Sequence, residues 1–144
     1  MFETILVPVN DTEVSAKAVA TAVKFAQEIG GTLTLLHCLE PLPTYTGSVA
    51  SYLPEGELER AAKEYGQSIL DKFASQLPHG GGHQTHLHQG DKKAWREIVA
   101  FAEAQNIDLI LMGSHGRTGL EHTLLGSVAE RVARHTDIPV MLIS

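Results

Sequence analysis

Residues 107–135 read IDLILMGSHGRTGLEHTLLGSVAERVARH, a strand pattern joined to a helix pattern by a loop that contains glycine. The apolar run at 107–112 is typical of a strand, and the spacing at 128–135 is typical of a helix. Loops that lead from a strand into a helix N-terminus are common phosphate sites in α/β proteins. The stretch therefore indicates an α/β fold and directs attention to residues 113–127.

The glycines of this loop have a defined spacing. Two residues separate Gly113 from Gly116, nine separate Gly116 from Gly126, and Ser127 follows directly. Because glycine has no Cβ, it can take a positive φ and lets main-chain N–H groups approach an anion closely. A helix that begins near Ser127 would also point its unpaired N–H groups and the positive end of its dipole at this place. Nucleotide binding is therefore the leading hypothesis.

The rest of the chain also alternates strand and helix patterns. We expect strands at 4–9, 33–39, 83–89, 108–112 and 140–143, and helices at 15–29, 57–77, 127–136 and over a segment that follows Asp91. Connections of crossover length imply parallel strands with right-handed crossovers. The predicted fold class is α/β: one doubly wound, five-stranded parallel sheet of order 3-2-1-4-5 with helices on both faces. It is Rossmann-like and forms a single domain over residues 1–144.

Turn and cap residues predict where the helices begin and end. The cluster 10–12 (Asn-Asp-Thr) supplies N-cap chemistry for the first helix, Gly30-Gly31 stops it, and Asp91 can cap the third. Residues 40–56 contain three prolines and two glycines, so a long loop is expected there. The apolar face expected for the second helix comprises Leu58, Ala62, Tyr65, Ile69 and Phe73.

Composition and charge limit the class of protein. There are 17 acidic and 11 basic residues, the net charge is −6, and no stripe or cluster of Lys and Arg appears in the sequence. This disfavours nucleic acid and anionic membranes as partners. The lone Cys38 lies in an apolar run and rules out an internal disulfide or a cysteine-based zinc site. Without a signal-peptide pattern or an apolar run of membrane-spanning length, a cytoplasmic location is expected.

The expected strand order selects the same loop as the glycine spacing. In a sheet of order 3-2-1-4-5, the winding direction reverses between the first and the fourth strand. Ligands of doubly wound sheets bind at this position, beside the carboxyl ends of the strands. The two loops that meet there are residues 10–12 and 113–127.

Three segments carry a resemblance to a known family. They are ETILVPVNDTE at 3–13, LTLLHCLEP at 33–41 and GSHGRTGLEHTLLGSVAERVARHTDIPVMLI at 113–143. Together they resemble the universal stress protein family, in particular its ATP-binding branch, essentially from end to end. The signature of that branch is two glycines separated by two residues, then a third glycine after nine more, followed by Ser or Thr. The glycine loop described above matches it.

The resemblance implies a site for ATP, or for AMP or ADP. Main-chain amides of 113–116 and 126–128 would bind the phosphates and ribose, while the backbone of Val9 and residues around Cys38 would line the adenine pocket. The implied binding residues are Pro8, Val9, Asn10, Cys38, Met112, Gly113, Ser114, His115, Gly116, Arg117, Gly126, Ser127 and Val128. Relatives also dimerise through the last strand, so a homodimer that covers this apolar edge is expected.

One position departs from the family pattern. Asn10 stands where the family commonly has an aspartate, and Asp11 follows one position later. Asparagine can hydrogen-bond a ribose hydroxyl or an adenine edge, but it brings no negative charge to help hold a magnesium ion. Affinity, magnesium dependence and base preference therefore stay open at this point.

Several loop residues have a second interpretation. Ser127 and Glu130 match the Ser-x-x-Glu capping box, so the Ser127 hydroxyl serves either the helix N-terminus or the phosphate. The glycines would, in the alternative, only shape a turn. His115 is a polar spacer or a proton carrier, and Arg117 binds phosphate or is solvated.

The histidines do not predict a metal site. His86 and His88 fall on one face of the expected strand, with His83 before them. No carboxylate or cysteine is spaced to complete a ligand set, so a solvated polar face is expected. His37, in an apolar run, is expected to be a hydrogen-bonded strand residue.

The predicted function is that of a nucleotide-binding regulatory protein of the stress response. ATP or AMP would act as a signal that changes a surface read by a protein partner. Enzymatic activity is the weaker alternative, because the chain lacks a Walker loop and no lysine follows Gly126. Slow ATP hydrolysis or self-phosphorylation stays open as that alternative, and an interaction module without nucleotide binding is a third.

Overall fold

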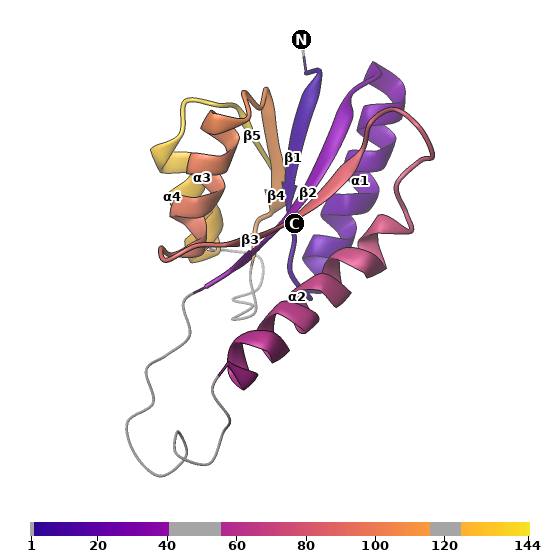
Figure 1. The fold of residues 1–144 in the computed structure, drawn as a ribbon. Coiled ribbons are helices and arrows are strands. Elements are labelled where there is room, and N and C mark those ends of the chain that lie inside the picture. Colours follow the sequence, from indigo (N-terminus) through magenta and orange to yellow (C-terminus); the bar gives the residue numbers. More distant parts are fainter. Residues whose placement is uncertain (1, 41–55, 116–124) are drawn as a thin grey trace.

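The computed structural model describes residues 2–40, 56–115 and 125–144. Its strands are β1 (Thr4–Pro8), β2 (Thr32–Leu39), β3 (Gln84–Gln89), β4 (Leu109–Gly113) and β5 (Val140–Ile143). Its helices are α1 (Glu13–Ile29), α2 (Glu57–Ala74), α3 (Ala94–Ala104) and α4 (Ser127–His135). Neighbouring strands are parallel, and the sheet has the order β3-β2-β1-β4-β5 (Figure 1). The predicted fold class and strand order are therefore confirmed.

Helices cover both faces of the sheet. α1 and α2 pack on one face, and α3 and α4 pack on the other (Figure 1). Side chains of β1 alternate between the two layers: Ile5 and Val7 pack with α1 and α2, whereas Leu6 packs with α3 and α4. All three are fully buried. Burial on both faces explains why β1 is a nearly continuous apolar run.

Local signals fix both ends of α1. The Thr12 side chain accepts a hydrogen bond from the main-chain N–H of Ser15 at 3.3 Å, so the helix begins at Glu13, two residues before the predicted start. Gly30 has a left-handed backbone with φ of 77°, and its N–H donates to the carbonyl of Ala26 at 2.8 Å. The predicted N-cap cluster and glycine stop are confirmed.

The core face of α2 differs from the prediction. Leu58 and Tyr65 are 40% and 49% exposed, and the helix ends at Ala74 instead of residue 77. A Cβ on Gly66 would lie 2.9 Å from a ring carbon of His37, so the helix approaches β2 most closely at this glycine. The buried residues of the helix are Gly66, Ile69, Leu70 and Phe73. An apolar pattern does not detect a face centred on glycine.

Asp91 does not cap α3, so that prediction is wrong. The N-cap position is Lys93, whose own side chain makes no cap hydrogen bond, and the main-chain N–H of Ala94 donates to Oε1 of Glu40 at 3.4 Å. Instead, Oε1 of the buried Glu97 accepts a hydrogen bond from the main-chain N–H of Lys92 at 3.1 Å. Oε2 of Glu97 lies 2.6 Å from Nε2 of His88. The carboxylate that orders this turn therefore comes from within the helix.

The two edges of the sheet differ in character. The predicted polar edge strand is confirmed as β3, in which Gln84, His86 and Gln89 are exposed. At the other edge, all four residues of the apolar β5 are half-buried. Residues 41–55 of the predicted long loop lie outside the described residues. None of the helices in the described ranges has the length and apolar character needed to cross a membrane.

Candidate functional site

The predicted site lies at the carboxyl edge of the sheet, where β1 and β4 are neighbours. Pro8 ends β1, Met112 and Gly113 end β4, and Val9 follows β1. Pro8, Val9 and Met112 are buried. Both α1 and α4 begin at these carboxyl ends, because α1 follows β1 and α4 follows β4 in the chain (Figure 1). Two helix N-termini therefore face the same side of the molecule.

The Asn10 side chain is built into the turn before α1. Its Oδ1 accepts hydrogen bonds from the main-chain N–H of Thr12 at 3.0 Å and from the Thr12 and Ser15 hydroxyls at 2.5 and 2.8 Å. The Ser15 Oγ accepts in turn from the main-chain N–H of Asn10 at 3.0 Å. Since three donors converge on the oxygen, the Nδ2 group is the part of this side chain that remains for a ligand.

Asp11 is engaged by α2. The Tyr65 hydroxyl donates a hydrogen bond to Oδ2 of Asp11. The contact joins the loop after β1 to a helix that the sequence places far away. The carboxylate next to Asn10 is therefore directed toward the protein's own tyrosine.

Gly113 is required by packing. A Cβ at this position would lie 2.8 Å from Cγ1 of Val14, in the first turn of α1, and 3.4 Å from the Val14 carbonyl carbon. The close approach of α1 to the end of β4 therefore depends on the missing side chain. Gly113 has no positive φ, and Gly126 has an ordinary extended backbone with φ of −62°. The expectation that these two glycines turn the chain through positive φ is wrong.

The two ends of the glycine loop are held together. The main-chain N–H of Gly126 donates to the carbonyl of Ser114 at 2.6 Å, and the N–H of Ser114 donates to the carbonyl of Ile143 at 2.8 Å. The buried Ser114 hydroxyl lies 2.8 Å from Nδ1 of the half-buried His115. The structure therefore brings 113–115 and 126–128 to one place, while Gly116 and Arg117 lie outside the described residues.

Within the described ranges, no side chain caps the N-terminus of α4. Gly126 occupies the N-cap position and Ser127 is already the first helical residue. Of the two roles considered for Ser127, the capping box with Glu130 is therefore wrong, because Ser127 is one position too late to cap. Glu130 instead pairs with Arg134 at 2.7 Å. The first-turn N–H groups of α4, beginning at Ser127 and the half-buried Val128, receive no side-chain acceptor from the described residues.

Hydrogen bonds to Val9 fix the end of β1 against β2. The N–H of Val9 donates to the carbonyl of Leu36 at 2.8 Å, and Nδ1 of His37 lies 2.8 Å from the Val9 carbonyl oxygen. Because a carbonyl only accepts, Nδ1 of His37 carries the proton. The prediction that His37 is a hydrogen-bonded strand residue is confirmed.

Cys38 lies next along β2 and is half-buried. Burial, followed by the nearby carboxylates of Glu97 and Glu40, raises the pKa of its thiol to about 12. The thiol therefore stays protonated at neutral pH and is a poor nucleophile. Cys38 can contribute packing to a site, and not covalent chemistry.

The comparison with known families decides the class of protein. The model of the universal stress protein family matches residues 1–144. The chain belongs to the universal stress protein family. Universal stress protein MJ0531 of Methanocaldococcus jannaschii is 34% identical over 146 residues, which cover 99% of this chain and 82% of that protein. Universal stress protein YxiE of Bacillus subtilis is 30% identical over 148 residues, which cover 99% of each chain.

Solved universal stress protein structures have the same fold. The structure of MJ0577 of Methanocaldococcus jannaschii has a TM-score of 0.79 and 28% identity, covering 99% of this chain and 96% of that one. A universal stress protein in complex with cAMP has a TM-score of 0.69 at 20% identity, covering 99% of this chain and 97% of that one. The Archaeoglobus fulgidus protein in complex with dAMP has a TM-score of 0.57 at 21% identity, covering all of both.

The histidines of this universal stress protein serve packing and hydrogen bonding. Within the described ranges, no group of three or more His, Cys, Asp or Glu residues is placed to hold a metal ion. Nδ1 of His83 accepts from the main-chain N–H of Leu33 at 2.9 Å, and His88 pairs with Glu97. Both are half-buried, whereas His86 is exposed. The predicted solvated face therefore holds for His86 alone.

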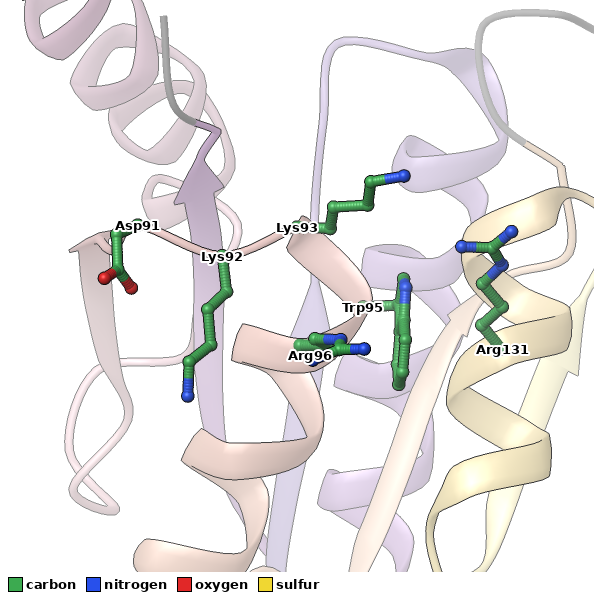
Figure 2. Close-up of a pocket in the computed structure, with 6 residues that line it drawn as sticks. All are labelled: Asp91, Lys92, Lys93, Trp95, Arg96 and Arg131. Atoms are coloured by element: carbon green, nitrogen blue, oxygen red, sulfur yellow. The ribbon is translucent and has the colours of Figure 1, made fainter.

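One cluster of charged residues forms only in the folded protein. Lys92, Lys93 and Arg96, at the start of α3, line a cavity together with Arg131 of α4 and Trp95 (Figure 2). The expectation that the chain has no basic cluster is wrong for the folded protein, because α4 brings Arg131 to residues far away in the sequence. The signal of this cluster in the sequence is the adjacent pair Lys92 and Lys93, directly before α3.

Proposed function

We propose that this universal stress protein binds an adenine nucleotide, ATP, AMP or ADP, with the phosphates at the N-terminus of α4. The main support is the absence of a side-chain cap on the first turn of that helix among the described residues. Such a helix end presents main-chain N–H groups and the positive end of its dipole to an anion. The hydrogen bond from Gly126 to Ser114 keeps this end beside β4.

The ribose and adenine are proposed to lie toward β1 and β2. Asn10 retains its Nδ2 donor for a ribose hydroxyl or an adenine acceptor, and Pro8, Val9 and Cys38 provide the apolar side. The remaining residues of the proposed site are Met112, Gly113, Ser114, His115, Gly116, Arg117, Ser127 and Val128. Solved proteins of this fold in complex with cAMP and with dAMP support the choice of an adenine nucleotide. A magnesium ion would be held by the phosphate oxygens, since Asn10 supplies no negative charge to bind it.

The ligand is proposed to act as a signal. The carbonyl of Ser114 accepts a hydrogen bond from Gly126 and its N–H donates to Ile143 of β5, so a shift of Gly126 on ligand binding would reach the edge strand through two hydrogen bonds. A nucleotide that changes this edge, or the segments at 40–56 and 113–127, would change a surface that a protein partner reads. Phosphate transfer would need a positioned base or cation, and His115 is already paired with Ser114.

Calorimetry with ATP, AMP, GTP and adenosine tests the proposal. We expect micromolar binding of ATP and AMP, weaker binding of GTP, and little binding of adenosine, because the phosphates meet the helix N-terminus. Gly126→Val should abolish binding, since its isopropyl group fills the phosphate position while its backbone angles suit valine. Thermal unfolding of the variant confirms that the fold is retained. Equal ATP affinity in the variant and the parent would contradict the proposal.

Two further outcomes separate the alternatives. A ligand at a hundred times its dissociation constant should add about 2.7 kcal/mol to stability. No thermal shift with ATP, AMP or GTP would indicate an interaction module that lacks nucleotide binding. Release of phosphate from ATP above background, lost in Gly126→Val, would indicate a slow ATPase.

We also propose that residues 1–144 form one domain that pairs as a homodimer through β5, in the cytoplasm. β5 is an edge strand of four half-buried apolar residues, and a bare apolar edge invites further pairing. A twofold contact is the commonest way to close such an edge. Light scattering should give twice the mass of the chain at micromolar concentration, and a monomer mass would contradict the dimer.

A further inference from the structure

A polar cavity lies between the start of α3 and α4, outside the proposed nucleotide site. It has a volume of about 290 Å³ and is lined by Asp91, Lys92, Lys93, Trp95, Arg96 and Arg131 (Figure 2). Among the described residues, four basic side chains and one carboxylate therefore line it, in a protein with 11 basic residues and a net charge of −6. A positive cavity on an acidic protein attracts anions locally.

None of these four cations is neutralised within the described part of the chain. The ion pairs there join Arg60 to Glu57, His88 to Glu97 and Arg134 to Glu130, and no pair includes a cation of the cavity. Arg134 lies on the same helix as Arg131 but does not line the cavity. The cavity charge is therefore available to a ligand.

Trp95 supplies a second, independent observation. Its Nε1 is buried and, among the described residues, has no hydrogen-bond acceptor. Buried donors of this kind are normally paired, so the indole N–H calls for an acceptor. In Figure 2 the Lys93 side chain extends toward α4 and the Arg131 guanidinium lies beside the indole, on the side away from Arg96. Lys93, Arg131 and Trp95 therefore line one cavity, and the indole carries a buried N–H without an acceptor among the described residues.

The shape of the cavity favours a compact oxyanion over a nucleobase. The Trp95 ring is already covered by the Arg96 guanidinium, 5.1 Å from the ring centroid, and by His135, whose ring centroid is 4.5 Å away. A base would need such a face for stacking. The volume is at the lower end of that of ligand pockets, about 300 Å³ and above. Arg and Lys donors match phosphate oxygens, which also accept from an indole N–H.

We propose that this cavity is an oxyanion site for a compact phosphate group of two or more negative charges. Lys93, Arg131 and the Trp95 indole N–H bind the oxygens, and Lys92 and Arg96 add charge. Arg131 lies one turn along α4 from Ser127, and neither Gly126 nor Ser127 of the proposed phosphate position lines the cavity. The proposal goes beyond nucleotide binding and does not depend on it.

Intrinsic fluorescence tests the proposal directly, because Trp95 is the only tryptophan of the chain. Inorganic pyrophosphate should change its emission with saturation. Arg131→Gln and Lys93→Gln should each weaken that binding by about tenfold or more, as expected for loss of a charged hydrogen-bond donor. Arg134→Gln removes the same charge from the same helix outside the cavity and should bind as the parent does. Calorimetry on the same variants gives the stoichiometry.

The remaining outcomes separate this site from the nucleotide site. Gly126→Val should leave pyrophosphate binding at Trp95 unchanged while it abolishes ATP binding at the glycine loop. Loss of pyrophosphate binding in Gly126→Val, with retention in Arg131→Gln, would place the ion at the loop and overturn the proposal. Equal losses in Arg134→Gln and Arg131→Gln would show diffuse attraction and also overturn it, as would tighter binding of an oligoglutamate peptide than of pyrophosphate.

Discussion

The N-termini of α1 and α4 lie at the same edge of the sheet but differ in how their first turns are satisfied. At α1, the Thr12 hydroxyl accepts from Ser15, and the Asn10 carboxamide oxygen accepts from Thr12 and Ser15. At α4, the N-cap is Gly126, and no side chain of the described residues takes the place of Thr12. One helix end is closed by the protein's own oxygen atoms, and the other, which has no such acceptor among the described residues, is where we propose that the phosphates bind.

The difference shows how two similar helix ends can have separate tasks. A side-chain oxygen at an N-cap stabilises the protein and removes the site from ligand binding. A glycine at the same position gives up that stability and exposes N–H groups. We therefore expect changes at α1 to alter stability and changes at α4 to alter affinity.

The largest stability effect is expected where the first turn of α1 packs on the end of β4, the strand that leads to α4. In Gly113→Ala, the new Cβ would lie 2.8 Å from Cγ1 of Val14 and would push α1 away from β4. Overpacking of this kind costs about 1–3 kcal/mol of unfolding free energy, which urea denaturation measures. Adding Val14→Ala should restore most of the loss. If the double variant is no more stable than Gly113→Ala, the glycine is needed for a reason other than this contact.

A smaller effect is expected from removal of the α1 cap. Thr12→Ala deletes the oxygen that accepts from Ser15 and should cost about 1 kcal/mol of unfolding free energy. ATP affinity measured by calorimetry should stay close to that of the parent, and Thr12→Ser should retain stability. A loss of affinity comparable to that of Gly126→Val would show that α1 binds the ligand directly and would remove the contrast between the two ends.

The smallest effect is expected at the amino ends of β1 and β4, where a carboxylate of the protein accepts hydrogen bonds from main-chain amides. Oδ2 of Asp108 accepts from the N–H groups of Glu3 and Thr4 at 3.0 and 3.1 Å, and these bonds lower the pKa of Asp108 below 3.8. A lowered pKa contributes stability that is present above the ordinary value and is lost as pH falls through the lowered one.

Asp108→Asn should therefore be slightly less stable than the parent at neutral pH, with the difference vanishing in acid below pH 3.8. Unfolding midpoints measured from pH 7 downward check this. A difference that is constant over the whole range would show that the ionised carboxylate plays no part. The site is a reference for how main-chain N–H groups at a strand end bind a carboxylate.

The fold was predictable because strand and helix patterns are strong where burial is two-sided. Residues 4–9 and 33–39 form apolar runs, and Gly30 and Thr12 mark helix ends by local chemistry. Caps set by tertiary contacts were not predictable. Asp91 precedes a helix that Glu97 orders from within, because the chain after β3 passes close to that carboxylate.

The position of the candidate site was predictable from the sequence, but the roles of its individual residues were not. Glycine spacing and strand order identified 113–127, yet Gly113 serves packing against Val14, a contact with a residue almost a hundred positions away. Ser127 matched a capping pattern whose register is one residue off in the structure. The cavity around Trp95 depends on the approach of α4 to α3, which no local pattern records.

The most direct test adds a charge at the open helix end. Ser127 is exposed and is the first residue of α4, where a glutamate complements the helix dipole and should leave stability equal or raise it by about 0.3–1 kcal/mol. Calorimetry with ATP is measured on Ser127→Glu and on Ser127→Gln, which has the same shape without the charge. The account predicts a loss of affinity of about tenfold or more in Ser127→Glu relative to Ser127→Gln, because phosphate and carboxylate compete for the same N–H groups. Equal ATP affinity in the two folded variants would contradict a phosphate site at the N-terminus of α4.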